Sequence, residues 1–368
     1  MKQWQETSHI VGRIAVLAES GEQAAVATVV RIEGSAYRRT GAKLLVEESG
    51  TTVGGVSGGC LEADVREMGL AVMRDNTPRL RHYETGSDDN KVWGLGLGCD
   101  GTVDVFVQPA TSTEALEVFA RVRQLLEGDM AFAVSTVLTG QGSDGRAVGA
   151  GRALVWADGR AVAGSTGDIE LDGAIARQAA EYLAEGQSTL CNVSSVQVFT
   201  EIQVPPPRLV IFGAGDDAMS LAASASHVGF RVAVVDHRPA YLEPERFPDA
   251  THLINARPGE GTGNLALGPS SYAVVMTHSF AHDRAWVDHL LGTDLSYIGL
   301  LGARVRTEKI VEPLVGEESD RVFGPVGLDI GADGPEQVAV SIVAELLAVS
   351  ADREPRHLRE REGAIHVF

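Results

Sequence analysis

The segment LVIFGAGDDA, residues 209–218, determines the fold expected for the second half of the chain. Four apolar residues run into a turn with the pattern G-x-G-x-x-A, and helical spacing follows from residue 219. In such a turn Gly213 permits the sharp bend, Gly215 lets the backbone approach a pyrophosphate, and Ala218 lets the helix pack closely on the strand. The N–H groups at the helix start attract phosphate. The segment therefore predicts a strand, a turn and a helix that hold a dinucleotide or another phosphate-bearing ligand.

Short apolar runs alternate with helical patterns through the rest of this half of the chain. This alternation is typical of parallel βαβ units, so we expect an α/β fold with a Rossmann-like parallel-sheet domain. The predicted strands are residues 209–212, 232–235, 273–276 and 297–300, and the predicted helices are residues 219–228, 284–291, 305–314 and 336–349.

Polar residues at the ends of these strands are candidates for ligand contact. Asp236 ends the second predicted strand, about 20 residues after the turn, where an acidic side chain reaches a ribose hydroxyl. His278 and His282 follow the strand 273–276, at the carboxyl edge where open α/β sheets bind ligands. Capping or hydrogen bonding within the protein is an equally good interpretation of these histidines. Asp216 and Asp217 place negative charge beside the phosphate position. A Rossmann fold that serves as a scaffold and binds no nucleotide is therefore the alternative interpretation.

Three consecutive prolines at residues 205–207 indicate a stiff connector between two domains, since proline disrupts both sheets and helices. We therefore expect a first domain over residues 1–204, a second over 208–350 and a charged tail over 351–368. The first domain is predicted to be mixed α/β, and its strand order does not follow from the sequence. No internal repeat is detected. Its predicted helices are residues 7–17, 61–73, 113–126 and 172–183, and its predicted strands are residues 24–32, 43–46, 103–107 and 131–138, with a hairpin at 154–163.

The composition excludes several classes of protein. The formal net charge of −19 makes nucleic acid and anionic membranes unfavourable partners. Three cysteines cannot form a disulfide framework, which favours a reducing compartment. No apolar run is long enough for a membrane span, and the first residues do not resemble a signal peptide. We expect a cytoplasmic protein.

Two glycine-rich loops of the first domain each end in a cysteine. The first is VGGVSGGCLE, residues 53–62, and the second is WGLGLGCDG, residues 93–101. Cys60 is predicted at a helix start, which favours the thiolate, and the glycine N–H groups of such loops can form an anion-binding nest. A small buried residue beside a turn is the alternative for both Cys60 and Cys99. Their spacing does not match a structural zinc site, although metal ligation by the pair is possible.

The loop GSAYRRTGAK, residues 34–43, is the one local basic cluster that opposes the acidic character of the chain. Arg38, Arg39 and Lys43 flank a turn and could clamp a phosphate or another oxyanion. A solvated loop paired with nearby acids is the alternative.

These segments together resemble the XdhC/CoxI family of molybdenum-cofactor accessory proteins. The resemblance lies in the loops GGVSGGCLE, GLGLGC and GSAYRRTGAKLLV, in RLVIFGAGDDA, and in the later segments VVDHRPAYL, VVMTHSFAHD and YIGLLGARVRTEKI. It therefore extends over nearly the whole chain. Two positions depart from the pattern, because Tyr37 stands where proline is usual and Asp100 stands where glycine is usual.

Membership of this family implies a protein that binds molybdenum cofactor (molybdopterin) and assists its sulfuration with a cysteine desulfurase. It also implies delivery of the cofactor to a xanthine dehydrogenase-type molybdenum hydroxylase. By matching position, the resemblance assigns a cofactor pocket in which both cysteines are candidates for molybdenum contact. The residues of that pocket are Arg38, Arg39, Gly58, Gly59, Cys60, Gly98 and Cys99.

Three functions remain open at this point. The first is a cofactor chaperone without turnover, which we expect to be a homodimer. The second is an NAD(P)-dependent oxidoreductase, for which His278 or His282 would transfer the proton. The third is a scaffold that a nucleotide opens or closes. Because an oxidoreductase does not explain the two glycine–cysteine loops, the chaperone is ranked first.

Overall fold

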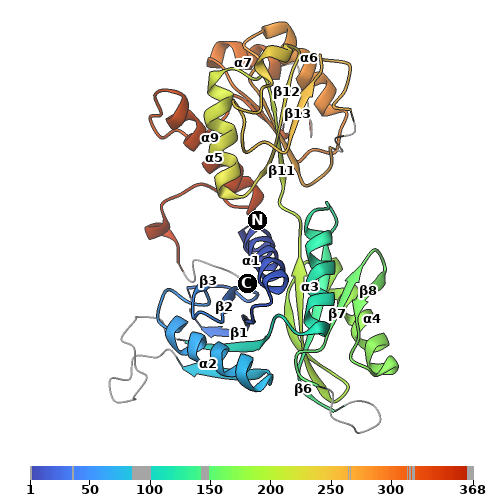
Figure 1. Ribbon diagram of the computed structural model, residues 1–368. Coiled ribbons are helices and arrows are strands. Elements are labelled where there is room, and N and C mark those ends of the chain that lie inside the picture. The colour runs from blue at the N-terminus through green and yellow to red at the C-terminus, as the bar shows by residue number, and fades with distance from the viewer. Residues whose placement is uncertain are drawn as a thin grey trace. The chain divides into compact units, whose positions relative to one another are not determined.

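The computed structural model describes residues 2–34, 37–84, 101–141, 149–263, 265, 267–312, 314, 316 and 320–362. The chain divides into two compact units, and the division falls within the proline run, between Pro205 and Pro206 (Figure 1). Among the helices of the described ranges, none combines the length and the apolar character needed to cross a membrane.

The N-terminal unit consists of two repeats of one arrangement, helix–strand–strand–strand–helix–strand–strand. The first repeat contains α1 (Lys2–Ser20), β1 (Ala24–Gly34), β2 (Lys43–Glu47), β3 (Thr52–Gly54), α2 (Glu62–Asp75), β4 (Arg79–Glu84) and β5 (Gly101–Pro109). The second contains α3 (Thr113–Leu126), β6 (Phe132–Gly140), β7 (Ala153–Ala157), β8 (Arg160–Gly164), α4 (Ile169–Glu185), β9 (Thr189–Val193) and β10 (Val196–Gln203). Their sheets have equivalent strand orders, β3-β2-β1-β5-β4 and β8-β7-β6-β10-β9.

The equivalence of the repeats extends to the register of individual residues. Leu44 lies opposite Gly54 in the first sheet, and Leu154 lies opposite Gly164 in the second. Both glycines have left-handed backbones, and a Cβ on either would overlap the carbonyl oxygen of the first residue of the neighbouring strand. The expectation of no internal repeat was therefore wrong. The repeats share backbone constraints, while most of their side chains differ.

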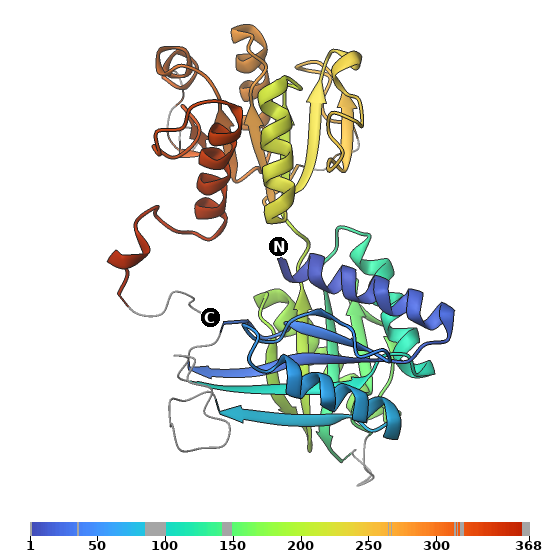
Figure 2. The same ribbon diagram turned by 60° about the vertical axis from the view of Figure 1, so that its left-hand side comes forward.

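Successive side chains of a strand point to opposite faces of the sheet. Buried apolar residues occupy both sets of positions, and helices cover both faces of each sheet in the N-terminal unit. On the first sheet, α2 covers one face through Val65 and Val72, and α1 covers the other through Ile10 and Ile14 (Figure 2). On the second sheet, α4 and α3 cover the two faces in the same way, and α1 packs against α3. The two sheets meet directly in a small cluster of equivalent residues, Val30 and Phe106 from the first repeat with Leu138 and Phe199 from the second.

The C-terminal unit confirms the predicted parallel sheet. Six parallel strands have the order β13-β12-β11-β14-β15-β16, which is the 3-2-1-4-5-6 order of a Rossmann fold. One face packs against α5 and α9, and the other packs against α6 and α7 (Figure 1). The strands are β11 (Arg208–Phe212), β12 (Arg231–Asp236), β13 (His252–Asn255), β14 (Ser271–Val275), β15 (Tyr297–Leu300) and β16 (Val322–Phe323). The helices are α5 (Asp216–Val228), α6 (Phe280–Leu291), α7 (Arg304–Val311) and α9 (Pro335–Ser350), with 3-10 turns η1 (Pro239–Tyr241) and η2 (Leu358–Glu360).

Two glycines of the β7–β8 hairpin allow a test of the close contact that the repeats share. Gly164 and Gly159 have nearly the same φ, 73° and 71°, but only Gly164 has an atom within 4 Å of an added Cβ. We expect Gly164→Ala to lower the free energy of unfolding by about 1–3 kcal/mol more than Gly159→Ala, as overpacking does. Urea denaturation of both variants measures this difference. Equal losses would show that the backbone conformation, and not the contact, requires glycine.

Candidate functional site

Three connections of the first repeat leave its sheet at one end. Gly34, at the end of β1, lies opposite Gly101 at the start of β5, and Glu84, at the end of β4, lies opposite Thr102. Because β3 runs antiparallel to β2, its last residue Gly54 also lies toward this end. The sheet therefore brings together the basic loop and the Cys60 loop that the sequence singles out. Gly98 and Cys99 belong to the third connection and lie outside the described residues.

The basic loop and the Cys60 loop touch at Tyr37. An added Cβ on Gly58 would lie 3.4 Å from Cγ of the Tyr37 ring, and the Tyr37 side chain is 75% exposed. Arg38 turns toward α1 and donates to both carboxylate oxygens of Glu6 at 2.5 Å, while Arg39 is exposed. Of the two predicted arginines, one is thus engaged by an acid of this chain and the other lies at the surface.

Ser57 organises the Cys60 loop from within. Its Oγ accepts the backbone N–H groups of Gly59, Cys60 and Leu61, each at 3.1 Å, and donates to the carboxylate of Glu62. Burial alone would raise the pKa of Glu62, but hydrogen bonds from the Ser57 hydroxyl and from nearby backbone N–H groups outweigh burial and lower it. The anion-binding nest predicted from the glycines is therefore filled by a hydroxyl of the protein. The half-buried Cys60 packs against the core of the first repeat.

Lys43 is buried, which corrects its grouping with Arg38 and Arg39 as a clamp for an oxyanion. It is 6% exposed, and its Nζ donates to Oε1 of Glu201 at 2.5 Å and to the carbonyl of Gly41 at 3.0 Å. Its own carbonyl accepts the N–H of Gly55 at 2.8 Å. Glu201 also accepts from Gln203 at 2.8 Å. Lys43 therefore connects the basic loop, the Cys60 loop and the second repeat, a role that no local sequence pattern indicates.

The second repeat keeps the loop architecture but not the reactive groups. Asp172, at the position of Glu62, accepts from Ser165 and Thr166, so an acid in the first helical turn again holds the preceding loop. By the register of the repeats, Ala153 stands at the position of Lys43. The spacing from Gly164 to Asp172 equals that from Gly54 to Glu62, so Glu170 stands at the position of Cys60. The thiol and the buried lysine are therefore features of the first repeat.

Cys191 has a structural environment. It lies half-buried on β9, and its Sγ donates to Oε1 of Gln178 at 3.4 Å and to the carbonyl of Val198 at 3.7 Å. Burial raises the pKa of the Cys191 thiol, which keeps the neutral form. These contacts give Cys191 a structural role.

In the Rossmann unit the two glycines of the β11–α5 turn have different surroundings. A Cβ on Gly213 would lie 2.5 Å from the carbonyl oxygen of Met276, so packing against the end of β14 requires this glycine. Of the groups that the structure describes, only the His278 ring would lie near a Cβ on Gly215, at 3.7 Å. Ala218 is fully buried and packs in the core below the turn. The turn is thus tightly packed on one side and accessible at Gly215.

Asp236 is held by donors of the protein at the position where the sequence predicts a ribose contact. Its carboxylate accepts from the N–H of Ala214 at 2.7 Å and from the backbone and guanidinium of Arg238 at 2.8–3.0 Å. Burial opposes ionisation, but these hydrogen bonds lower the pKa of Asp236 to about 2. Arg238 in turn lies 3.8 Å above the ring of Tyr241. A ribose hydroxyl would have to compete with Arg238 for this carboxylate.

The histidines at the carboxyl edge contact protein groups. His278 adopts a left-handed backbone, with φ of 58°, and its Nε2 lies 3.6 Å from Asp217. The ring of His282 packs edge-on against that of His237, at 4.9 Å between centroids. Within the described ranges, no group of three or more histidine, cysteine or acidic side chains has an arrangement suited to a metal ion. Molybdenum contact by Cys60 and Cys99 together, and nucleotide contact by His278, stay predictions.

Comparison with known proteins identifies the family. Residues 209–346 match the family model described as the XdhC Rossmann domain. Residues 17–84 and 125–194 match the model described as the XdhC and CoxI family, and these two segments fall in the first and the second repeat.

Similarity to individual proteins extends over nearly the full length. The chain is 35% identical over 332 residues to a probable xanthine dehydrogenase subunit from Bacillus subtilis, which covers 90% of this chain and 94% of that protein. It is also 35% identical over 98 residues to the molybdenum cofactor insertion chaperone PaoD of Escherichia coli, 26% of this chain and 30% of PaoD. The crystal structure of a xanthine dehydrogenase from Bacillus halodurans has a TM-score of 0.74 at 31% identity, covering 94% of this chain and 96% of that one. The chain belongs to the XdhC and CoxI family, as the sequence motifs indicated.

The buried pair of Lys43 and Glu201 makes a testable contribution to stability. Lys43→Met leaves a buried carboxylate without its cation, so we expect the free energy of unfolding to fall by about 3–5 kcal/mol. The double variant Lys43→Met with Glu201→Gln removes both charges and should recover most of that loss. Urea denaturation of the variants tests this coupling. If the double variant is as unstable as Lys43→Met alone, the lysine stabilises the fold by contacts other than its pairing with Glu201.

The low pKa of Asp236 predicts a pH-dependent stability of the Rossmann unit. A carboxyl whose pKa is lower in the folded state stabilises the fold above its ordinary pKa of 3.8, and this contribution disappears as the pH falls toward about 2. Asp236→Asn should therefore lower the free energy of unfolding by roughly 2 kcal/mol near neutral pH. The difference from wild type should shrink between the two pKa values. Asp288→Asn, at an exposed position of α6, is the control. A pH-independent difference would contradict the assignment.

Proposed function

We propose that this chain is an accessory protein that binds molybdenum cofactor and delivers it to a xanthine dehydrogenase-type molybdenum hydroxylase. The names of two relatives, a molybdenum cofactor insertion chaperone and a probable component of xanthine dehydrogenase, support this assignment. The observation that carries it is the asymmetry of the repeats. Only the first combines Cys60, the exposed Arg39 of the basic loop and the buried Lys43 at one end of its sheet. We place the cofactor at that end.

The residues at this end suit the cofactor, which is the cargo of the protein. The cofactor carries a terminal phosphate and a molybdenum ion bound by sulfur. A guanidinium such as that of Arg39 binds phosphate, and a thiol such as that of Cys60 is a soft donor for molybdenum or a carrier of sulfur. Among the described residues, no atom lies within 4 Å of a Cβ added to Gly59. Because Ser57 occupies the loop N–H groups, side chains must supply the contacts.

The proposal also includes sulfuration of the cofactor with a cysteine desulfurase, which the family resemblance implies, and a homodimeric state, which would close the cofactor pocket from water. A nucleotide in the Rossmann crevice would act on cofactor handling, and the accessible backbone at Gly215 supports such a site. The proposal includes no oxidoreductase activity, because such an activity does not explain the two glycine–cysteine loops of the first domain.

Anaerobic purification from a host that makes molybdenum cofactor tests the assignment. We expect stoichiometric pterin, measured as its fluorescent oxidation product, in the wild type and loss of most of it in Cys60→Ser. Cys191→Ser is the matched control and should retain the pterin, because Cys191 lies on β9 among structural contacts. Loss in Cys99→Ser alone would move the site to the connection between β4 and β5. A wild type without pterin, even after incubation with free cofactor, would refute the proposed function.

A further inference from the structure

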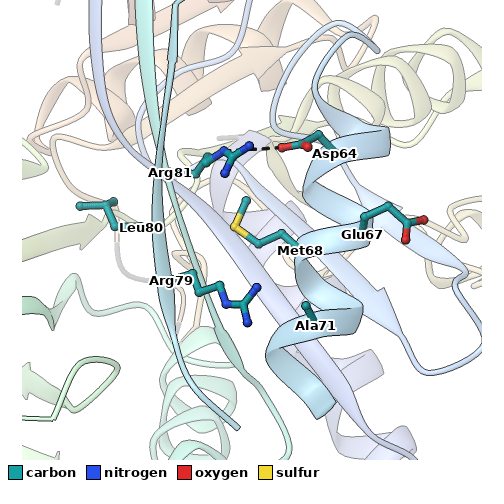
Figure 3. A pocket seen from close by; sticks show the side chains of 7 residues that line it. All are labelled: Asp64, Glu67, Met68, Ala71, Arg79, Leu80 and Arg81. Atoms are coloured by element: carbon teal, nitrogen blue, oxygen red, sulfur yellow. Dashed lines mark ion pairs between the residues drawn. The ribbon is translucent and has the colours of Figure 1, made fainter. Parts of the chain in front are cut away.

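A cavity of about 450 Å³ lies between α2 and the edge strand β4 of the first repeat (Figure 3). Arg79 and Arg81 extend from β4 toward the helix, whereas Leu80 points to the other side of the strand (Figure 3). Met68 lies between the two arginines and provides an apolar, adaptable surface. The lining residues are Asp64, Glu67, Met68 and Ala71 from α2, with Arg79, Leu80 and Arg81 from β4.

The backbone of β4 is open along this groove. β4 pairs with β5 along its whole length, and it pairs with no other strand in the part of the chain that the structure describes. An open strand edge presents unpaired N–H and C=O groups, to which an extended peptide can add as a further strand.

The strand side of the groove carries the positive charges of Arg79 and Arg81, whereas the helix side carries the acids Asp64 and Glu67. Arg81 lies 3.9 Å from Asp64, beyond hydrogen-bonding distance, and Asp64 already accepts the hydroxyl of Tyr83 at 2.5 Å. Arg79 pairs with Asp75 at the end of α2. The side chains of Arg79 and Arg81 are 43% and 52% exposed, and they are two residues apart on one face of the strand. Acidic side chains at alternate positions of an added strand would meet both guanidinium groups.

The second repeat shows that the fold itself does not require such a groove. Cys191 stands at the position of Arg81, since the two residues pair with the equivalent residues Val198 and Val105. Its thiol donates to Gln178, and Gln178 donates to Tyr182, so the side chains of α4 and β9 bond to each other. Leu190 packs between the two sheets, whereas the equivalent Leu80 is 39% exposed.

We propose that this groove binds an extended acidic segment of the recipient hydroxylase as an added strand on β4. The identity of the partner rests on the proposed function. The location agrees with delivery, because Leu61 alone separates Cys60 from the start of α2, and β4 ends where the connection to β5 leaves the sheet. A segment bound here would reach the end of the sheet that holds the cargo.

Hydrogen exchange tests the proposal with the full-length chain and a cofactor-free molybdenum hydroxylase of the xanthine dehydrogenase type. We expect the hydroxylase to slow exchange of the amides of residues 79–84. Arg81→Glu should weaken the complex about tenfold, which corresponds to about 1.4 kcal/mol. The matched control is Arg160→Glu, which makes the same charge change on the exposed edge strand β8 of the second repeat and should leave affinity unchanged. Arg79→Glu, at the other end of the groove, provides a second test.

The possible outcomes separate this proposal from the proposed function. If the complex forms without slower exchange in β4, and Arg81→Glu binds with the same affinity, the groove is not the binding site. The proposed delivery function is then unaffected. If no complex forms although the chain binds pterin, both the proposed delivery to the hydroxylase and the proposed role of the groove are refuted. Slower exchange in β4 that depends on protein concentration without hydroxylase assigns the groove to a second copy and overturns the acidic partner.

Discussion

An ammonium group buried between the two repeats must be paired, because a lone charge away from water is strongly destabilising. Lys43 meets this requirement with a carboxylate from the second repeat and a carbonyl from the basic loop. Its backbone simultaneously holds the start of the Cys60 loop. The position of the basic loop relative to the thiol therefore depends on a polar contact that crosses between the repeats. Burying the charges of Lys43 and Glu201 costs desolvation free energy. The defined geometry of their pair agrees with a role in fixing the positions of the two loops.

The duplication within the N-terminal unit provides an internal control for every functional argument. Features present in both repeats, such as the left-handed glycines and the acid that holds the loop before the second helix, belong to the fold. Features present in one repeat require another explanation. Cys60, Lys43 and the open groove beside β4 all belong to the first repeat. Cys60 and Lys43 lie at the loop end of its sheet, and the groove runs along β4 toward that end. We therefore interpret the second repeat as a scaffold and the first as the part that handles cargo and partner.

The sequence predicted the Rossmann unit well, because parallel strands between helices have continuous apolar runs and the glycine turn is distinctive. It missed β3, β4, β9 and β10 of the N-terminal unit and β13 and β16 of the Rossmann unit. The side chains of β4 and β9 are exposed or mixed and lack an apolar pattern, and the repeat was missed because shared backbone geometry leaves little sequence identity. Both loops of the candidate site were found from their glycines, arginines and cysteine. The burial of Lys43 was not, since its partner Glu201 is 158 residues away. The sequence motif also did not predict the pairing of Asp236 with Arg238, because that motif assigns the acid to a ribose hydroxyl.

Hydrogen exchange of the cofactor-loaded chain against the cofactor-free chain tests the central claim most directly. The claim is that the cargo lies at the loop end of the first repeat. It predicts slower exchange in residues 37–42 and 55–61, with no change in the equivalent loop at residues 165–171. Slower exchange in residues 165–171, or only in the turn between β11 and α5, would place the cofactor elsewhere and contradict the account.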